Sequence, residues 1–499
     1  MYQLEKEKKL SESLLWELQE RYYRTHGPDV WSKRGLPSYA TSNALTIEYD
    51  AHLILAYLQD LGTQQPAYLF DLGAGSGQCG YLLIKKLREL APALRFTYVM
   101  TDVAAKNIQF WKEHPFLKPY IQEGFLDFAV YRHDQQDPLR LQISGKEMEQ
   151  GVPLILLCNY YFDTLPQDLF RIHQGKLEEG RVSLYLQEGS PLDQDNPDTL
   201  NHLDIEFSYH AVTAESYPEI KEILIDYLKR PPKGPFAIPH GGMTSIDFFS
   251  KISKGSLLAL IGDHGVALQE DLDAKGDQWI ARHMNFSVAV NFDALRRYFE
   301  KKGGFIMLPT TSQPLFIMGA AVLGGSIQNF PKTQSVYQET IGRYDINRYY
   351  QELAAVSQET PPLPIILSIL ERGKWDPVIF EGFLPALHHA IPQANEKELT
   401  ALQHAIQQVK VNFYPISPKK GLFLAQLGEL LFAMHQIPQA LACFEQAFLV
   451  HGPSPELWKS LGACYLELGN KDTALECLLN SEIRDRDTED KERHERQKT

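Results

Sequence analysis

The spacing of hydrophobic residues changes along the chain, and each change predicts a different type of structure. Over residues 13–61, apolar side chains recur every three or four positions, which predicts a helical cap in residues 1–60. A short apolar run at residues 68–71 then precedes an amphipathic stretch, residues 78–90, and a second apolar run, residues 95–101. A strand, a helix and a strand in this order predict a βαβ unit with two parallel strands.

Strand-like runs continue beyond this unit, with helical segments between several of them. They lie at residues 128–132, 154–158, 256–261 and 316–322. Alternating strands and helices predict an α/β domain over residues 61–325, in which a mostly parallel sheet is covered on both faces.

About ninety residues separate the strand-like runs at residues 154–158 and 256–261, which is too long for a simple connection. This length predicts an insertion over about residues 168–250. Within it, residues 168–187 are typical of a β-hairpin with its turn near Glu179-Gly180, and residues 204–210 alternate like another strand. Insertions beside a ligand site often supply contacts to the substrate, and others only cover the core.

The C-terminal part of the chain shows an internal repeat. After a linker around residues 329–335, the pattern is helical over residues 336–483, and Gly428 and Gly462 occupy equivalent positions 34 residues apart. This spacing is typical of tetratricopeptide repeats, whose paired helices need small residues where they approach closely. We therefore expect an all-α repeat domain that binds a protein partner, followed by a charged, solvated tail at residues 484–499.

Composition and charge exclude several classes of protein. The chain has 63 acidic and 49 basic residues among 499, a formal net charge of -14, which disfavours binding to nucleic-acid phosphates. It contains no apolar run long enough to cross a membrane, and residues 1–20 lack the features of a leader peptide. The five cysteines form no Cys-x-x-Cys pair. We expect a cytoplasmic protein with reduced thiols, no membrane insertion, no nucleic-acid partner and no metal site.

A glycine-rich turn follows the first strand of the predicted sheet. Asp71 ends the strand, and Gly73, Gly75 and Gly77 occupy alternate positions after it. Glycine allows the backbone to approach a ligand without interference from a Cβ atom. S-adenosylmethionine fits such a turn, because its amino-acid part can lie against the glycines while the acid engages its ammonium group directly or through water.

The same turn also contains the Gly-x-Gly-x-x-Gly pattern of dinucleotide sites, at residues 75–80. In a nicotinamide site the first glycine directly follows the strand, whereas Asp71 and Gly73 intervene here. The order of residues favours S-adenosylmethionine over a dinucleotide. A turn that only packs a helix against a strand is the third interpretation.

Two further acids are expected near the same cofactor. Asp102 ends the second strand, where a carboxylate can bind both ribose hydroxyls, and Asp134 follows the third strand, near the expected adenine amino group. Asp137 is the alternative to Asp134. The predicted cofactor-binding residues are Asp71, Gly73, Gly75, Gly77, Asp102 and Asp134.

Candidate catalytic residues follow the fourth strand. Transfer of a methyl group mainly requires a nucleophile held in line with the methyl carbon and shielded from water. The amide oxygen of Asn159 could orient a substrate N–H, and Tyr160 could form a wall of the site. Asp163 could pair with a cationic substrate or cap the next helix.

Several separated segments resemble the MidA-type methyltransferase family. Residues 41–43 (Thr-Ser-Asn) resemble its Thr-Ser-Pro-Glu segment, and residues 71–77 its cofactor loop. Residues 159–166 (Asn-Tyr-Tyr-Phe-Asp-Thr-Leu-Pro) are similar to its Asn-Glu-x-x-Asp-Ala-Leu-Pro motif, residues 262–265 (Gly-Asp-His-Gly) to its Asp-Tyr-Gly segment, and residues 313–316 (Gln-Pro-Leu-Phe) to its Gln-x-x-Phe segment. The resemblance implies a class I, Rossmann-like methyltransferase fold over about residues 35–325.

The family includes mitochondrial complex I assembly factors that methylate an arginine of a protein. The resemblance therefore implies an S-adenosylmethionine-dependent methyltransferase that acts on a protein side chain, with arginine as one candidate. Tyr160 stands where the family usually has Glu, and His264 where it has Tyr. His264 could be a base or a structural residue. These two departures leave open a catalytically impaired adaptor with the same fold, and a small-molecule methyltransferase is a third possibility.

Overall fold

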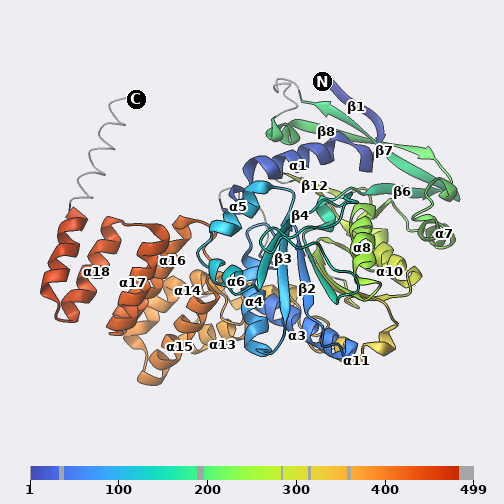
Figure 1. The fold of residues 1–499 in the computed structure, drawn as a ribbon. Coiled ribbons are helices and arrows are strands. Elements are labelled where there is room, and N and C mark those ends of the chain that lie inside the picture. The colour runs from blue at the N-terminus through green and yellow to red at the C-terminus, as the bar shows by residue number, and fades with distance from the viewer. Residues whose placement is uncertain are drawn as a thin grey trace. The chain divides into compact units, whose positions relative to one another are not determined.

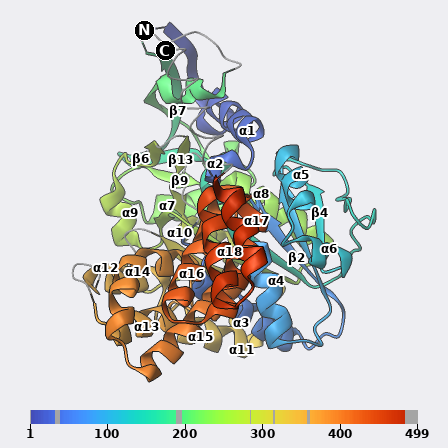
Figure 2. The same cartoon turned by 90° about the vertical axis from the view of Figure 1, so that its left-hand side faces the viewer.

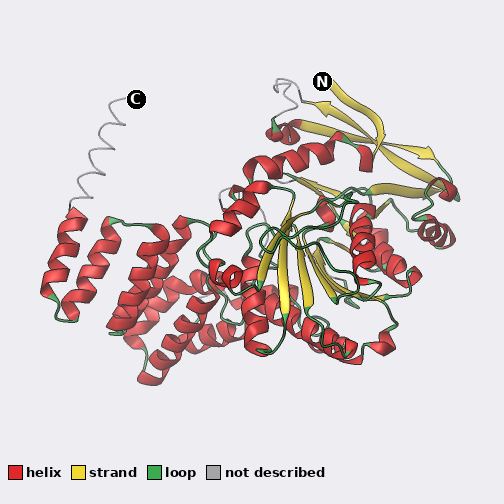
Figure 3. Ribbon diagram, in the orientation of Figure 1, coloured by secondary structure: helices red, strands yellow, loops and turns green. Residues whose placement is uncertain are grey.

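The computed structural model describes residues 2–32, 39–187, 196–282, 285–312, 316–356 and 361–482 (Figure 1). The chain forms two compact units, residues 1–349 and residues 350–499. The first contains both of the larger sheets, and the described part of the second is helical (Figure 3).

A seven-stranded sheet forms the centre of the first unit. In order across the sheet, its strands are β15 (Phe305–Met307), β16 (Ile317–Leu323), β10 (Leu257–Asp263), β5 (Leu154–Asn159), β2 (Ala67–Leu72), β3 (Phe96–Asp102) and β4 (Leu126–Val130). Strands β10, β5, β2, β3 and β4 are parallel, and β16 is antiparallel to both of its neighbours. One reversed strand next to the edge, with the chain switching direction between β2 and β5, is the arrangement of the class I methyltransferase fold. The predicted α/β class is confirmed.

Helices cover both faces of this sheet. Successive side chains of a strand point to opposite faces, so apolar strands present a hydrophobic surface on each side. On one face, Tyr98 and Met100 of β3 lie against α4 (Gln78–Leu90), so closely that a Cβ on Gly80 would lie 2.3 Å from the Met100 Cε atom. α3 (Ala44–Leu61) packs beside α4. On the other face, the rings of Phe70 of β2 and Phe249 of α8 (His240–Ser253) have centroids 4.9 Å apart. α4 has the predicted bounds.

The insertion forms a second, antiparallel sheet. β6 (Asp168–His173) and β7 (Lys176–Leu186) form its hairpin, and β8 (Leu203–Ala211) and β9 (Phe236–Ile238) extend it. The predicted turn position is wrong. The turn lies at Gln174-Gly175, where both residues have positive φ (49° and 75°) as a type I′ turn requires, and Gly180 lies within β7.

Residues 2–9, which are predicted to belong to a helical cap, form a strand. β1 (Tyr2–Lys9) pairs antiparallel with β7 of the insertion. The helical part of the N-terminal segment is α1 (Leu14–His26), which begins at Ser13, whose side chain accepts a hydrogen bond from Leu15 N. α1 lies between the two sheets (Figure 1).

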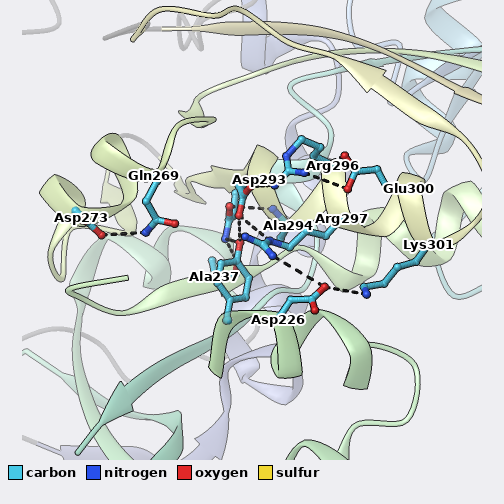
Figure 4. Close-up of polar contacts among 12 residues, drawn as sticks. Asp226, Ala237, Gln269, Asp273, Asp293, Ala294, Arg296, Arg297, Glu300 and Lys301 are labelled. Carbon is cyan, nitrogen blue, oxygen red and sulfur yellow. Dashed lines mark hydrogen bonds and ion pairs between the residues drawn. The ribbon is translucent and has the colours of Figure 1, made fainter. Parts of the chain in front are cut away.

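Charged contacts attach the insertion to the last helix before β15. Asp293 of α10 (Phe292–Lys301) accepts hydrogen bonds from Arg296, Arg297 and the Tyr227 hydroxyl of α7 (Lys221–Lys229). Asp226 of α7 forms an ion pair with Lys301 of α10 at 2.8 Å (Figure 4). α7 is therefore held to α10 by both buried and exposed polar contacts.

The other elements of the first unit are short. The helices are α2 (Asp29–Ser32), α5 (Ala105–Glu113), α6 (Lys118–Gln122), α9 (Gln269–Lys275) and α11 (Pro331–Glu339). The strands form two small pairs, β11 (Gly265–Val266) with β14 (Val290–Asn291), and β12 (Ile280–Arg282) with β13 (Phe286–Val288).

The first unit extends past the predicted linker at residues 329–335. The Tyr337 hydroxyl of α11 donates a hydrogen bond to Met318 O of β16 at 3.0 Å, and Asn347 Nδ2 donates to Phe316 O at 2.7 Å. Asn347 lies at the start of α12 (Ile346–Val356). Because these contacts join the segment to β16, it belongs to the first core.

The second unit is a succession of helices. They are α13 (Leu363–Arg372), α14 (Pro377–Ala390), α15 (Glu396–Asn412), α16 (Leu422–Ala433), α17 (Ile437–His451) and α18 (Pro455–Glu467), followed by a helix over residues 471–482. α16, α17 and α18 lie side by side in Figure 1, and Figure 2 shows them from the α18 end. The equivalent glycines permit close packing: a Cβ on Gly428 would lie 2.8 Å from the Phe444 ring, and one on Gly462 would lie 3.3 Å from Ala474 O. The predicted tail, residues 484–499, lies outside the described residues.

Candidate functional site

A cavity of about 660 Å³ lies at the carboxyl ends of three neighbouring strands of the large sheet. Asp71 of β2, Asp102 of β3 and Asn159 of β5 all line it. α1 adds Trp16 and Tyr23. In open α/β sheets, ligands bind at this edge, where adjacent strands connect in opposite directions, and the volume is typical of small-molecule sites.

Asp71 is buried beneath this cavity and held by β3. Its Oδ2 atom accepts a hydrogen bond from the Tyr98 hydroxyl at 2.9 Å, and its backbone carbonyl accepts one from the Thr101 hydroxyl at 3.0 Å. Burial and, to a smaller extent, the charge of Asp102 raise the pKa of Asp71 to about 7, against the hydrogen bond from Tyr98, which lowers it. A nearby cation would favour the ionised form.

The glycine turn lies directly above Asp71. Gly73, Gly75 and Gly77 all have positive φ, at 70°, 57° and 80°. A Cβ on Gly75 would lie 2.9 Å from the Trp31 ring, and Trp111 Nε1 donates a hydrogen bond to Gly75 O. Gly73 and Gly75 line the cavity, whereas Gly77 is the N-cap of α4.

Asp102 is held rigidly at the end of β3. Its Oδ1 atom accepts a hydrogen bond from Ala104 N at 2.8 Å, and Oδ2 accepts one from Asn107 Nδ2 at 2.7 Å. Burial raises the pKa of Asp102, and these hydrogen bonds oppose the shift. The side chain is therefore a fixed acceptor for ligand hydroxyls.

Asn159 and Tyr160 leave the end of β5 in an unusual conformation. Asn159 Nδ2 donates a hydrogen bond to Cys79 Sγ at 3.7 Å, and Tyr160 has a φ of 51°. Tyr160 N donates a hydrogen bond to Gly262 O at 2.8 Å, which continues the pairing of β5 with β10. The Tyr160 ring contacts those of His264 and Phe316, with centroids 5.5 Å and 5.0 Å away. A positive φ at a residue with a large side chain is costly and is often found at functional sites.

Asp163 lies next to a second buried carboxyl group. Asp163 N donates a hydrogen bond to Asp263 Oδ2 at 3.1 Å, and His264 N donates to Asp263 Oδ1 at 2.9 Å. Burial raises the pKa of both carboxyls. The charge of Asp163 raises the pKa of Asp263 further, whereas a hydrogen bond with Asp263 opposes the rise in the pKa of Asp163. Asp163 lines the cavity, and its buried Oδ1 atom has no hydrogen-bond partner among the described residues. It lies within a 3₁₀ helix (Phe162–Thr164).

No protein-family model matches this sequence, and no curated protein matches it. Similar solved structures include two proteins of one superfamily from Burkholderia thailandensis. One, named as a proposed methyl transferase bound to S-adenosyl-homocysteine, is 12% identical; the match covers 61% of this chain and 74% of that protein, with a TM-score of 0.38. The other, named as uncharacterized, is 11% identical. The match covers 64% of this chain and 95% of that protein, also with a TM-score of 0.38.

The CMeT domain of the citrinin polyketide synthase is also similar, at 11% identity and a TM-score of 0.26; the match covers 53% of this chain and 48% of that one. Scores this low identify neither a ligand nor a site residue in this chain.

The third predicted cofactor acid, Asp134, is paired with a neighbouring arginine. It forms a two-fold ion pair with Arg132, at 2.9 Å and 2.8 Å, and it is not among the described residues that line the cavity. Its neighbours Arg132 and His133 do line it. The conformation of the loop after β4 decides which of its side chains line the cavity. The hydrophobic pattern of the strand does not predict that conformation. Burial lowers the pKa of His133.

The contribution of the N-terminal segment was not predicted. Trp16, Tyr23 and Trp31 line the cavity together with charged residues of α1. Gln19 Nε2 donates a hydrogen bond to Phe286 O at 2.6 Å, which joins α1 to β13. The signal in the sequence was a helix with aromatic residues beside paired Glu and Arg, a pattern that is equally typical of a core-facing helix.

Other predicted segments also meet the cavity. Thr41 and Ser42 line it, and Asn43 is the N-cap of α3. Residues 313–315 lie outside the described residues. Across the described ranges, no cluster of three or more His, Cys, Asp or Glu could hold a metal ion, and no helix is long and apolar enough to cross a membrane.

Proposed function

We propose that this protein is an S-adenosylmethionine-dependent methyltransferase. The observation that carries the proposal is the meeting of Asp71, the Gly73–Gly75 turn and Asp102 in one cavity at the switch point of the sheet. Two acids at the ends of adjacent strands, with a turn free of Cβ atoms between them, match a ligand that has an ammonium group and two ribose hydroxyls.

The residues present fit this cofactor. Asp71 would hold the ammonium group, Gly73 and Gly75 would face the amino-acid part, and Asp102 would accept hydrogen bonds from the ribose. When bound, the cofactor supplies an activated methyl group on a sulfonium centre. The rings of Trp31 and Tyr161, which flank the glycine turn, would limit access of water to that region.

A dinucleotide fits less well, for electrostatic reasons. Its pyrophosphate would lie at the glycine turn, close to the buried carboxyls of Asp71 and Asp102. Like charges at short range in a region of low dielectric constant are unfavourable, whereas a cationic ligand is attracted to the same acids.

The acceptor would bind where Asn159, Tyr160 and Asp163 meet the cavity. The Asn159 amide can accept a hydrogen bond from an acceptor N–H and fix its direction. Asp163, with its buried and unpartnered Oδ1 atom, is suited to hold a cationic group or to receive its proton. Asn159 and Asp163 would supply these polar contacts, so catalysis would rest mainly on the orientation of the methyl acceptor.

For the substrate we propose a protein side chain, with arginine as a candidate. The buried carboxyl group of Asp163, which lines the cavity, supports a basic acceptor. We further propose that the helices of the second unit, which resemble tetratricopeptide repeats in their 34-residue spacing, recruit this protein or an associated factor.

Calorimetry with S-adenosylmethionine and with NAD tests the cofactor. We expect binding of the first and little of the second, and Asp102→Ala should weaken the binding about tenfold or more, because it removes charge-assisted hydrogen bonds. Binding of NAD alone would refute the proposal.

Labelled S-adenosylmethionine, incubated with the protein and a cell lysate, tests the reaction. Label on a distinct protein, lost in Asp71→Ala, is the expected result. Label only in low-mass material would indicate a small-molecule methyltransferase, and cofactor binding without any transfer would favour the adaptor.

A further inference from the structure

The last two helices of the second unit share an exposed leucine cluster. Leu466 and Leu468 are 56% and 47% exposed, and Leu475, Leu478 and Leu479 of the final helix are 58%, 45% and 51% exposed. On that helix, another face carries Ala474, Cys477 and Ser481, which are buried. Because positions three and four apart share a helix face, the exposed leucines form one stripe.

The same positions are covered one repeat earlier. Met434 and Phe444, which are equivalent to Leu468 and Leu478, are buried, and Phe432 and Leu441, equivalent to Leu466 and Leu475, are half-buried. The Phe444 ring lies against Gly428 of α16, and α18 contacts the adjacent part of α17. The rings of Phe448 and Trp458 lie 4.8 Å apart, and the Tyr465 hydroxyl donates a hydrogen bond to Glu445, the equivalent of Leu479. The leucine cluster therefore continues an interface that, within the chain, receives a helix.

Charge around the cluster is unbalanced. Asp472 and Glu476 lie beside the leucine stripe on the solvent side, and Glu467 and Glu482 lie near its two ends, all exposed. Lys471 is the one base among residues 471–482. A second copy of the chain would bring acid against acid, and residues 483–499 offer Ile483 as their one aliphatic side chain. Neither complements a leucine stripe with an acidic border.

We propose that the leucine cluster binds an amphipathic helix of a partner protein, one with an aliphatic stripe bordered by Lys or Arg. The helix would take the place that α18 takes on α17, with its basic residues against Asp472 and Glu476. This surface extends the recruiting role proposed for the repeats by naming its position and the chemistry of the partner. It does not depend on methyl transfer, because peptide binding at the leucine cluster requires neither the cofactor nor a methyl acceptor.

Fluorescence anisotropy of the full chain with two labelled synthetic helices tests this proposal. The probes are a Leu/Lys peptide and a Leu/Glu peptide of about five helical turns with the same leucine stripe. We expect the Leu/Lys peptide to bind about tenfold more tightly or better. In Leu475→Gln/Leu479→Gln its affinity should fall about tenfold, because two apolar contacts are lost.

Matched variants distinguish peptide binding at the leucine cluster from nonspecific hydrophobic binding. Leu449→Gln removes another leucine, 84% exposed on α17, and should leave the binding unchanged. Asp472→Asn/Glu476→Gln should weaken only the Leu/Lys peptide. Equal binding of both peptides, or equal loss in the Leu449 variant, would overturn the proposal. So would a dimer in ultracentrifugation that Leu475→Gln/Leu479→Gln dissociates, or tenfold tighter peptide binding after removal of residues 483–499.

Discussion

Buried carboxyl groups are concentrated around the glycine turn. Asp71 lies at the end of β2, and the carboxyl group of Asp50 in α3 is buried close enough to be affected by the charge of Asp71. Burial, with a smaller contribution from the charge of Asp71, raises the pKa of Asp50 to about 8. A cationic ligand at Asp71 would relieve this repulsion, so the site is arranged to bind positive charge more readily than negative charge.

The first prediction concerns Asp71 and the pH dependence of cofactor binding. Its raised pKa means that the carboxyl is protonated below about pH 7 and then holds an ammonium group poorly. The affinity for S-adenosylmethionine should therefore fall about tenfold between pH 7.5 and pH 6, in calorimetry at constant ionic strength. Asp71→Asn should bind weakly and lose this dependence. An unchanged pH profile in that variant would contradict the assignment.

The second prediction concerns Asp50 and stability. A carboxyl whose pKa is raised in the folded state stabilises the fold while protonated, and that stabilisation is lost as the pH rises through the folded pKa. From pH 6 to pH 8, the free energy of unfolding should fall by about 1.4 kcal/mol per pH unit because of Asp50 alone. Asp50→Asn should remove this slope in urea titrations. Asp137→Asn, at an exposed position, is the control and should retain it.

At the scale of elements, local signals predicted the parts of the site that local chemistry determines. The bounds of α4 followed from its amphipathic pattern and the glycine before it, and the acids at the ends of β2 and β3 followed from the apolar runs that precede them. The hairpin turn was misplaced because Glu179-Gly180 and Gln174-Gly175 are both plausible turn pairs. The pairing of Gly180 with Leu169 and Tyr209, which decides between them, involves distant strands.

The third prediction compares two glycines with similar φ, Gly75 at 57° and Gly62 at 61°. An added Cβ at Gly75 would lie 2.9 Å from Trp31, whereas at Gly62 nothing lies within 4 Å. Both Ala variants should lose about 1 kcal/mol of stability through backbone strain. Only Gly75→Ala should also lose cofactor affinity, by about tenfold or more, because the turn or Trp31 must move. Equal affinity of the two variants in calorimetry would show that the turn does not contact the cofactor.

At the scale of the first unit, the cover of the cavity depends on contacts across the whole sequence. α1 lines the cavity, yet it is attached through β1, which pairs with β7 more than 170 positions later. The sequence of residues 2–9 alternates charge with few apolar residues and carries no local sign of a strand. Its strand conformation comes from the free edge of β7, so only the assembled sheet reveals it.

The last prediction tests this long-range attachment at Glu5. Its buried carboxylate accepts hydrogen bonds from the Ser13 hydroxyl at 2.6 Å and from Leu14 N at 2.9 Å, so it joins β1 to the first turn of α1. Glu5→Ala leaves both donors without this acceptor, at a cost of about 1–3 kcal/mol. α1 should then open more often, which would be seen as faster amide exchange over residues 14–26 and weaker cofactor binding, although Glu5 does not line the cavity.

Lys6→Ala, on the exposed side of the same strand, is the matched control and should leave both measurements unchanged. If Glu5→Ala accelerates exchange in α1 without weakening the cofactor, α1 covers the site without contributing to binding. If neither measurement changes, β1 does not hold α1 over the cavity. Because Asp71 and the glycine turn are distant from Glu5 in the sequence, a coupled response would show that the two sheets act together in forming one site.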